Sequence, residues 1–142
     1  LIGKPGELVL SLPTLPVQQE ALIKTDQFQV EWLGKYLTLR FRIHYTGSEE
    51  GNQKGRIVLL LRGPQMVLAY PQGVLNFTSA MPMTEPKRGE YFSVSRFRGV
   101  EAKFGPLESR EDAEAIEVLL YGLGGDLMIH QLIAIKDEEP GG

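Results

Sequence analysis

Cysteine is absent from the 142 residues, and imidazole and indole side chains are scarce, with two histidines and one tryptophan. Without cysteine the chain can form neither a disulfide framework, nor a thiolate nucleophile, nor a cysteine-ligated zinc site. The two histidines, His44 and His130, belong to no HxH or HExxH motif, and no nucleophile elbow or GxGxxG loop is present. We therefore expect no catalytic residue, no metal site and no cofactor.

The sequence also lacks a long apolar run. No uncharged stretch approaches the about 18 residues that a membrane helix requires. Leu1 to Leu10 contains Lys4 and Glu7, which is unlike a signal peptide. We expect that this segment does not insert into a membrane, and the sequence is compatible with an anchor upstream of Leu1.

Net positive charge is missing as well, which argues against a nucleic-acid partner. The chain has 15 Lys and Arg against 18 Asp and Glu, and Asp137, Glu138 and Glu139 near the end account for the difference. We expect residues 137–142 to form a flexible acidic tail and residues 1–136 to form one domain. With 42% apolar residues that domain can build a core without disulfides.

Apolar and polar residues alternate along much of the chain, which predicts β-strands. GELVLSLP (6–13) predicts an edge strand that ends at Pro13. QFQVEWLG (27–34) and the following stretch to Thr46 predict a hairpin that turns at Gly34 and Lys35. RIVLLLRG (56–63) is apolar on both faces, as expected for a strand in the middle of a sandwich.

The remaining segments fit the same class of fold. Residues 17–26 allow either a short amphipathic helix or a strand at 21–23, and the acidic connector after Pro106 allows one helical turn. Further extended segments are expected at 65–71, 91–99 and 100–105 (hinged near Gly99), and at 115–122 and 126–136 as a final hairpin. Eight or nine strands with little helix predict an all-β, antiparallel β-sandwich, immunoglobulin-like or jelly-roll-like, or a partly open barrel.

A basic stripe is the first candidate site. In LRFRIHY (39–45), Arg40, Arg42 and His44 share one face of a strand, and Arg96 and Arg98 flank Phe97 further along the chain. If the two strands are neighbours, four guanidinium groups would share a face for an anionic partner, such as a polysaccharide, a lipid head group or an acidic protein segment. The simpler interpretation is a solvated sheet face on which the arginines pair with Glu31, Glu101 and Glu117.

An aromatic cluster is the second candidate site. Residues 72–90 form an irregular connection of unusual length, and aromatic residues lie in it or beside it. Aromatic rings on a β-sandwich can stack on sugars, although packing in a core or at its rim is their commoner use. The aromatic residues are Tyr70, Phe77, Tyr91 and Phe92.

The order of several stretches resembles the C-terminal β-domain of an uncharacterised group of membrane-anchored bacterial envelope proteins. The stretches are LRFRIHYTG, GRIVLLLRG, YFSVSRFRGVEAKF and AIEVLLYGLGGDLM, and the resemblance spans residues 26 to 130. It implies a sandwich on the periplasmic side of an inner-membrane anchor and implies no catalytic residues. We expect a non-enzymatic interaction or scaffolding module of the envelope with a protein or polysaccharide partner; the alternatives are a carbohydrate-binding module and, third, a small hydrolase.

Overall fold

The computed structural model describes residues 22–48, 50–76 and 83–135, and their fold is all-β, as the alternation predicts. The predicted strand at 6–13 and the residue Phe77 lie outside the described residues. Eight strands have five or more residues, two short strands form a separate pair, and the helical content is three single 3₁₀ turns. The strands are β1 (Ile23–Leu33), β2 (Tyr36–Tyr45), β3 (Gln53–Gly63), β4 (Met66–Tyr70), β5 (Leu75–Asn76), β6 (Met83–Thr84), β7 (Glu90–Val94), β8 (Phe97–Phe104), β9 (Ala115–Gly122) and β10 (Leu127–Ala134).

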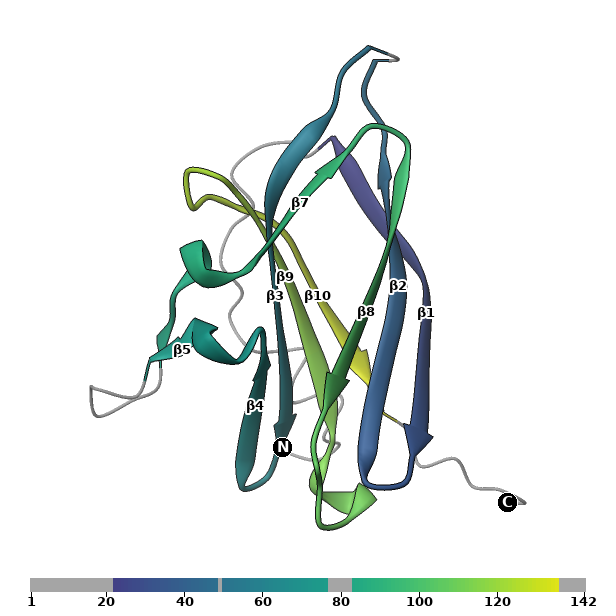
Figure 1. Ribbon diagram of the computed structural model, residues 1–142, viewed down its shortest axis with the longest axis vertical. Coiled ribbons are helices and arrows are strands. Elements are labelled where there is room, and N and C mark those ends of the chain that lie inside the picture. The colour runs from purple at the N-terminus through teal and green to yellow at the C-terminus, as the bar shows by residue number, and fades with distance from the viewer. Residues whose placement is uncertain (1–21, 49, 77–82, 136–142) are drawn as a thin grey trace, which may run out of the picture.

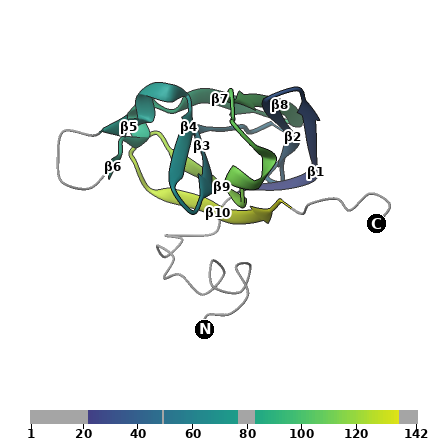
Figure 2. The same cartoon turned by 90° about the horizontal axis from the view of Figure 1, so that it is seen from below.

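Two antiparallel sheets pack face to face, which confirms the predicted sandwich (Figures 1 and 2). Sheet A has the order β1-β2-β8, and sheet B has the order β10-β9-β3-β4. One edge of β3 is shared, since its first half pairs with β7 and its second half pairs with β4, while β9 pairs along its other edge. β3 is apolar on both faces because its residues Val58 and Leu60, which point away from the core between the sheets, are also buried, in a second cluster with Val74 and Leu119.

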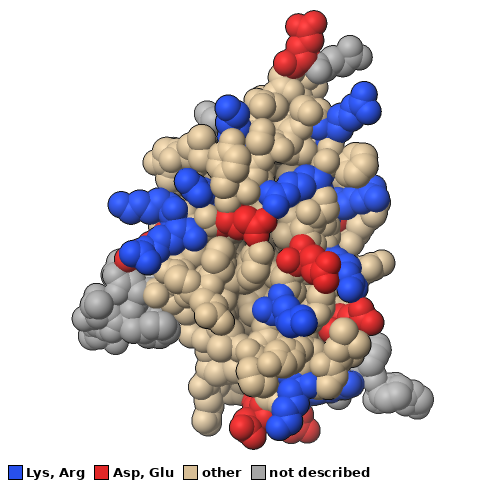
Figure 3. All heavy atoms as spheres, viewed as in Figure 1, with Lys and Arg blue, Asp and Glu red and all other residues tan. Residues whose placement is uncertain are grey.

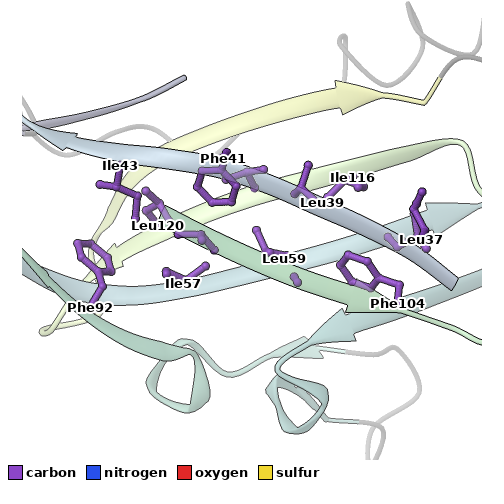
Figure 4. Close-up of a cluster of buried hydrophobic side chains, with 14 of the residues drawn as sticks. Leu37, Leu39, Phe41, Ile43, Ile57, Leu59, Phe92, Phe104, Ile116 and Leu120 are labelled. Carbon is purple, nitrogen blue, oxygen red and sulfur yellow. The ribbon is translucent and has the colours of Figure 1, made fainter. Parts of the chain in front are cut away.

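The core lies between the two sheets and is built from the inward side chains of both (Figure 4). Leu37, Leu39, Phe41 and Ile43, at every second position of β2, are no more than 2% exposed. They face the inward side chains of sheet B, among them Ile57, Leu59, Phe92, Ile116 and Leu120. The alternation of apolar and polar residues along β2 therefore matches the alternation of buried and solvent-facing side chains.

The β1–β2 hairpin forms as predicted, with Gly34 at a positive φ of 64° in its turn. The ladder has one irregularity: Asp26 pairs with Arg42 and Gln29 pairs with Arg40, so two residues of β1 oppose the single residue Phe41. This β-bulge contains Gln27, whose φ of 60° is left-handed. Such a backbone costs a residue other than glycine about 1–2 kcal/mol.

The connection between β7 and β8 differs from the predicted one. The break lies at Ser95 and Arg96, where the chain leaves sheet B and enters sheet A, and it does not lie at Gly99. Gly99 is a regular member of β8 opposite Arg42. The glycine suggested a hinge, but a glycine in a strand can instead leave space beside its neighbours.

The last two elements match the predictions. The connector after β8 contains one 3₁₀ turn, Arg110–Asp112, capped by Ser109. β9 and β10 form the expected hairpin, and Gly125 has a positive φ of 96° in its turn.

Candidate functional site

The basic stripe lies on the outer face of sheet A. β2 and β8 are antiparallel neighbours, as the hypothesis of a shared face required. Their register places Arg40 opposite Glu101, Arg42 opposite Gly99, and His44 opposite Phe97. The outer face therefore combines the three basic residues of β2 with an acid, a glycine and an aromatic residue of β8.

The predicted set of four guanidinium groups on one face does not form. Successive residues of a strand point to opposite faces, so Arg98 lies on the same face of β8 as the buried Val100, two positions later. Its side chain is therefore on the inner side of β8. There Arg98 Nη2 donates to Glu90 Oε2 at 2.5 Å and links β8 to β7 of the opposite sheet. Arg96 is exposed in the β7–β8 turn. Neither arginine therefore joins Arg40 and Arg42 on the outer face of sheet A.

Arg40 is neutralised by neighbouring strands, as the simpler interpretation predicted. Its Nη1 lies 2.9 Å from Glu31 Oε1, and its Nη2 lies 3.6 Å from Glu101 Oε2. The hydrogen bond to Glu31, followed by the charge of Glu101, raises the pKa of Arg40. This cross-strand cluster is exposed, so we expect it to add little to stability.

Arg42 differs from Arg40 because no acid among the described residues forms an ion pair with it. Its guanidinium carbon lies 4.6 Å from the centre of the Phe97 ring, in a cation–π contact. The neighbouring His44 is held by Asp26, whose Oδ1 lies 2.8 Å from Nε2. Arg42 is therefore the member of the stripe whose charge remains available to a partner.

A hollow of about 390 Å³ opens on this face beside Arg42, and we call it the sheet A hollow. A Cβ built on Gly99 would meet no atom within 4 Å, so the missing side chain leaves the space open. The bulge brings Gln27 to the rim next to Gln29. The lining residues are Gln27, Gln29, Arg40, Phe41, Arg42, Gly99, Val100 and Glu101.

Acids and bases are interspersed on the face around the hollow, and no single-sign patch covers β2 and β8 (Figure 3). Seven charged side chains face outward on the three strands of sheet A. Four are cations and three are carboxylates, which leaves a formal balance of +1. They are Lys24, Arg40, Arg42 and Lys103, and Asp26, Glu31 and Glu101.

The aromatic cluster does not form one site. Phe92 is 1% exposed in the core, because it faces inward from β7, and so it cannot stack on a ligand. Tyr91 is exposed and has the Arg56 guanidinium over its ring. Tyr70 is half-buried between the sheets and donates its hydroxyl hydrogen to Glu90, the same carboxylate that binds Arg98. The expected use of such residues in core and rim packing is what the structure shows for Tyr70 and Phe92.

A second hollow of about 630 Å³ lies where the edge strands β4 and β8 of the two sheets approach each other. Its lining is largely apolar, and it is contributed by β4, the segment that follows β4, and the end of β8. The lining residues are Val67, Leu68, Ala69, Tyr70, Pro71, Gln72, Leu75, Lys103, Phe104 and Gly105. Lys103 is the one charged member of this lining.

The two histidines lie on outward faces of different sheets and cannot share a ligand. His130 Nε2 lies 2.6 Å from Glu117 Oε2 on β9, and Arg62 Nε lies 2.8 Å from Glu117 Oε1. Glu117 is therefore a partner of sheet B residues and does not neutralise the stripe. Within the described ranges no group of three potential metal ligands exists, and neither hollow is lined by a histidine.

Several residues of the sheet A hollow were missed from the sequence. Gln27 and Gln29 read as ordinary outward strand residues, and Gly99 read as a hinge. A signal for the bulge was present: Ile23 and Thr25 face inward at odd positions, whereas Phe28 and Val30 face inward at even positions. The change of phase between Asp26 and Phe28 is what one extra residue in a strand produces.

The fold and the hollow define a β-sandwich domain with a polar, partly cationic depression on one sheet face. No family model and no curated protein matches the chain. Among solved structures, the chain is similar to beta-glucosidase 3B from Thermotoga neapolitana. The complex with glucose has a TM-score of 0.39, 13% identity and coverage of 82% of this chain, and the complex with alpha-D-glucose has a TM-score of 0.38, 15% identity and coverage of 81%.

The match spans about 16% of the length of the beta-glucosidase chain. A likeness of this extent carries no argument about the activity of the present chain. None of the helices in the described part of the chain is long and apolar enough to cross a membrane.

The inter-sheet bridge of Tyr70, Glu90 and Arg98 predicts a specific alkaline response. Burial, followed by the hydrogen bond to Glu90, raises the pKa of Tyr70 from 10.0 to about 12. Because the folded pKa exceeds the unfolded one, the stabilising contribution is complete below about pH 10 and is lost as the pH rises toward about 12. We expect the Tm of the wild type to fall more steeply than that of Tyr70→Phe across this window. Burial also raises the pKa of Tyr121, but the wild type and Tyr70→Phe both contain Tyr121, so its effect on the Tm is the same in both. If the two curves of Tm against pH are parallel, the bridge contributes nothing to stability.

Proposed function

We propose that this chain is a non-enzymatic binding module whose partner docks in the sheet A hollow. The observation that carries the proposal is Arg42, whose guanidinium lies beside the hollow and against the Phe97 ring, with no acid of the described residues in ion-pair range. A guanidinium without an acidic partner can take up an anionic group without first breaking an ion pair. An anionic group of a partner would meet the guanidinium in a paired, planar hydrogen-bonding geometry.

The bulge at Gln27 supports the same location. A left-handed residue other than glycine in the middle of a strand persists only where the surroundings or function favour it, and bulges re-aim side chains beside binding sites. Here the bulge adds the Gln27 amide to the rim on which Gln29 already lies. Five side chains that can form hydrogen bonds then line one depression: two amides, two guanidinium groups and the Glu101 carboxylate.

The arrangement of the histidines favours binding over catalysis. Each imidazole is engaged by a carboxylate, His44 by Asp26 and His130 by Glu117, on outer faces of different sheets. Histidine is the residue that most often acts as general acid or base, and neither hollow is lined by one.

We also propose that the module acts at the bacterial cell envelope, on the periplasmic side of an anchor. The support is the resemblance in sequence pattern over residues 26 to 130. Fractionation of cells that express the full-length protein tests this point. Recovery with the membrane, together with sensitivity to protease added to spheroplasts, agrees with the proposal, and recovery in the cytosol contradicts it.

A titration series tests the binding function. Calorimetry would measure the affinity of the chain for acidic and neutral polysaccharides, polyglutamate and anionic lipid vesicles. We expect saturable binding of at least one anionic probe and at least a tenfold weaker affinity for Arg42→Gln. The matched control is Lys103→Gln, which removes a cation from the same sheet face, where Lys103 lies over the Tyr36 ring outside the hollow; its affinity should stay within about twofold.

Two results would overturn this function. Absence of saturable binding to every anionic probe would leave the hollow without a partner. Equal weakening by Arg42→Gln and Lys103→Gln would mean that only diffuse charge attracts the probe and that the sheet A hollow is not its binding site.

A further inference from the structure

We infer that the occupant of the sheet A hollow is an acidic polysaccharide built from uronic acids, with a sugar carboxylate on Arg42 and a sugar ring against Phe97. This inference rests on the proposed binding function and adds the chemical class of the ligand. It follows from three properties of the face: its charge density, its hydrogen-bonding groups and its exposed aromatic ring.

The charge balance of the face selects a ligand of low charge density. Outward residues of sheet A carry a formal balance of +1, because the three carboxylates offset all but one of the four cations. A polyglutamate segment, a polyphosphate or an anionic membrane would bring many negative charges against Glu31 and Glu101 as well as against Arg42, and like charges in close contact are unfavourable. A uronic acid chain carries at most one carboxylate for each sugar ring. In a chain that alternates uronic acids with neutral sugars, the rings beside the one on Arg42 carry no charge toward Glu31 and Glu101.

The polar groups of the hollow suit hydroxyl groups. A sugar hydroxyl donates and accepts hydrogen bonds, and the lining offers both functions through the amides of Gln27 and Gln29 and the carboxylate of Glu101. A ligand with acceptors only, such as a phosphate, would leave the Glu101 carboxylate opposed to it. The mixed lining therefore favours a polyhydroxylated ligand.

Phe97 provides the apolar contact that saccharides use. It is 55% exposed even though the Arg42 guanidinium lies over its ring. The exposed part of such a ring can stack on the C–H face of a pyranose. Arg42 and Phe97 adjoin each other, so one sugar can contact both.

The shape of the site fits a short section of a polymer. The volume of about 390 Å³ lies near the lower end of ligand sites, which span about 300–1,000 Å³. The lining residues come from β1, β2 and β8, so the hollow touches all three strands of sheet A. A chain can lie across the sheet with one section in the hollow and its neighbours over the exposed face.

The test is calorimetric titration with defined oligosaccharides. The probes are oligogalacturonate, alginate oligomers and hyaluronan oligomers, each paired with its carboxyl-reduced counterpart, and polyglutamate as the acidic peptide. We expect saturable binding of at least one uronate probe, and at least a tenfold weaker affinity for its carboxyl-reduced form and for Arg42→Gln.

Two aromatic variants separate stacking from general changes in the face. Phe97→Leu should lower the affinity for the uronate probe at least tenfold. Phe97→Tyr should keep the affinity of the wild type, because tyrosine keeps the aromatic ring. Tyr36→Leu is the control: Tyr36 lies beneath Lys103, which does not line the hollow, whereas Phe97 lies beneath Arg42, which does. Its affinity should stay within about twofold of the wild type.

The outcomes distinguish the ligand class from the binding function. Binding of polyglutamate that depends on Arg42 but not on Phe97, with no binding of any uronate probe, would overturn the polysaccharide and retain the binding module. Uronate binding that is unchanged by carboxyl reduction or by Phe97→Leu would also overturn the inference. Failure of every anionic probe would overturn the inference and the binding function together.

Discussion

Phe92→Ala will destabilise the protein by about 3–5 kcal/mol, as expected for loss of a fully buried aromatic ring. Phe92 is 1% exposed and packs in the main core between the sheets, where Figure 4 shows it pointing inward. The surrounding strands cannot close the cavity without moving the sheets relative to each other. Urea denaturation followed by circular dichroism measures the free energy of unfolding of the variant and the wild type.

The neighbouring residue Tyr91 provides the control. It is 46% exposed, and its described ring contact is the Arg56 guanidinium at 5.6 Å. Tyr91→Ala should therefore cost no more than about 1 kcal/mol. Similar losses in the two variants would contradict the assignment of adjacent β7 residues to the core and to the surface.

The second large effect is expected for Gly55→Ala. A Cβ at Gly55 would lie 2.2 Å from the backbone oxygen of Tyr121 and 3.0 Å from the Phe92 ring. Gly55 pairs with Phe92 on one side and Gly122 on the other, so neither neighbouring strand can retreat without breaking its ladder. We expect a loss of about 1–3 kcal/mol or more, typical of an overpacked core.

The same substitution at Gly99 should have the opposite sign. A Cβ there meets open space, and alanine in a strand interior is favoured over glycine by about 0.5–1 kcal/mol. Comparison of the two alanine variants by thermal denaturation tests whether Gly99 is present for packing or for the space above it. A destabilised Gly99→Ala would mean that the sheet A hollow is filled by the protein itself.

Much of the sandwich could be predicted from the sequence because each inward strand position leaves a local trace. Leu37, Leu39, Phe41 and Ile43 alternate with polar residues, and sheet burial requires that spacing. The doubly apolar run in residues 56–63 identified the strand at the centre of sheet B. These features depend on neighbouring residues alone.

The partners of charged side chains could not be predicted in the same way. Arg98 was grouped with Arg40 and Arg42 because it is basic, yet its position in β8 turns it toward Glu90 of the other sheet. Glu117 was considered a partner of the stripe, yet β9 lies in sheet B, where Glu117 binds Arg62 and His130. Pairing depends on strand order and register, which residues distant in the chain determine together.

The sheet A hollow was predictable only in part. The stripe of Arg40, Arg42 and His44 was found from its spacing, and β8 proved to be the neighbouring strand. The depression itself depends on a glycine beside open space and on a bulge at Gln27, and both are properties of the assembled sheet. The phase change in the alternation of β1 was the one trace of the bulge in the sequence.

¹H–¹⁵N NMR spectra recorded during titration with the uronate oligomer that binds best show directly where the ligand lies. We expect the largest shift changes on the residues around the sheet A hollow, among them the backbone amides of Gly99 and Arg42, the side-chain amides of Gln27 and Gln29, and the guanidinium Nε of Arg42. Shift changes centred on Val67 to Gln72 in the hollow between β4 and β8, or spectra that do not change at saturating oligomer, would contradict this expectation.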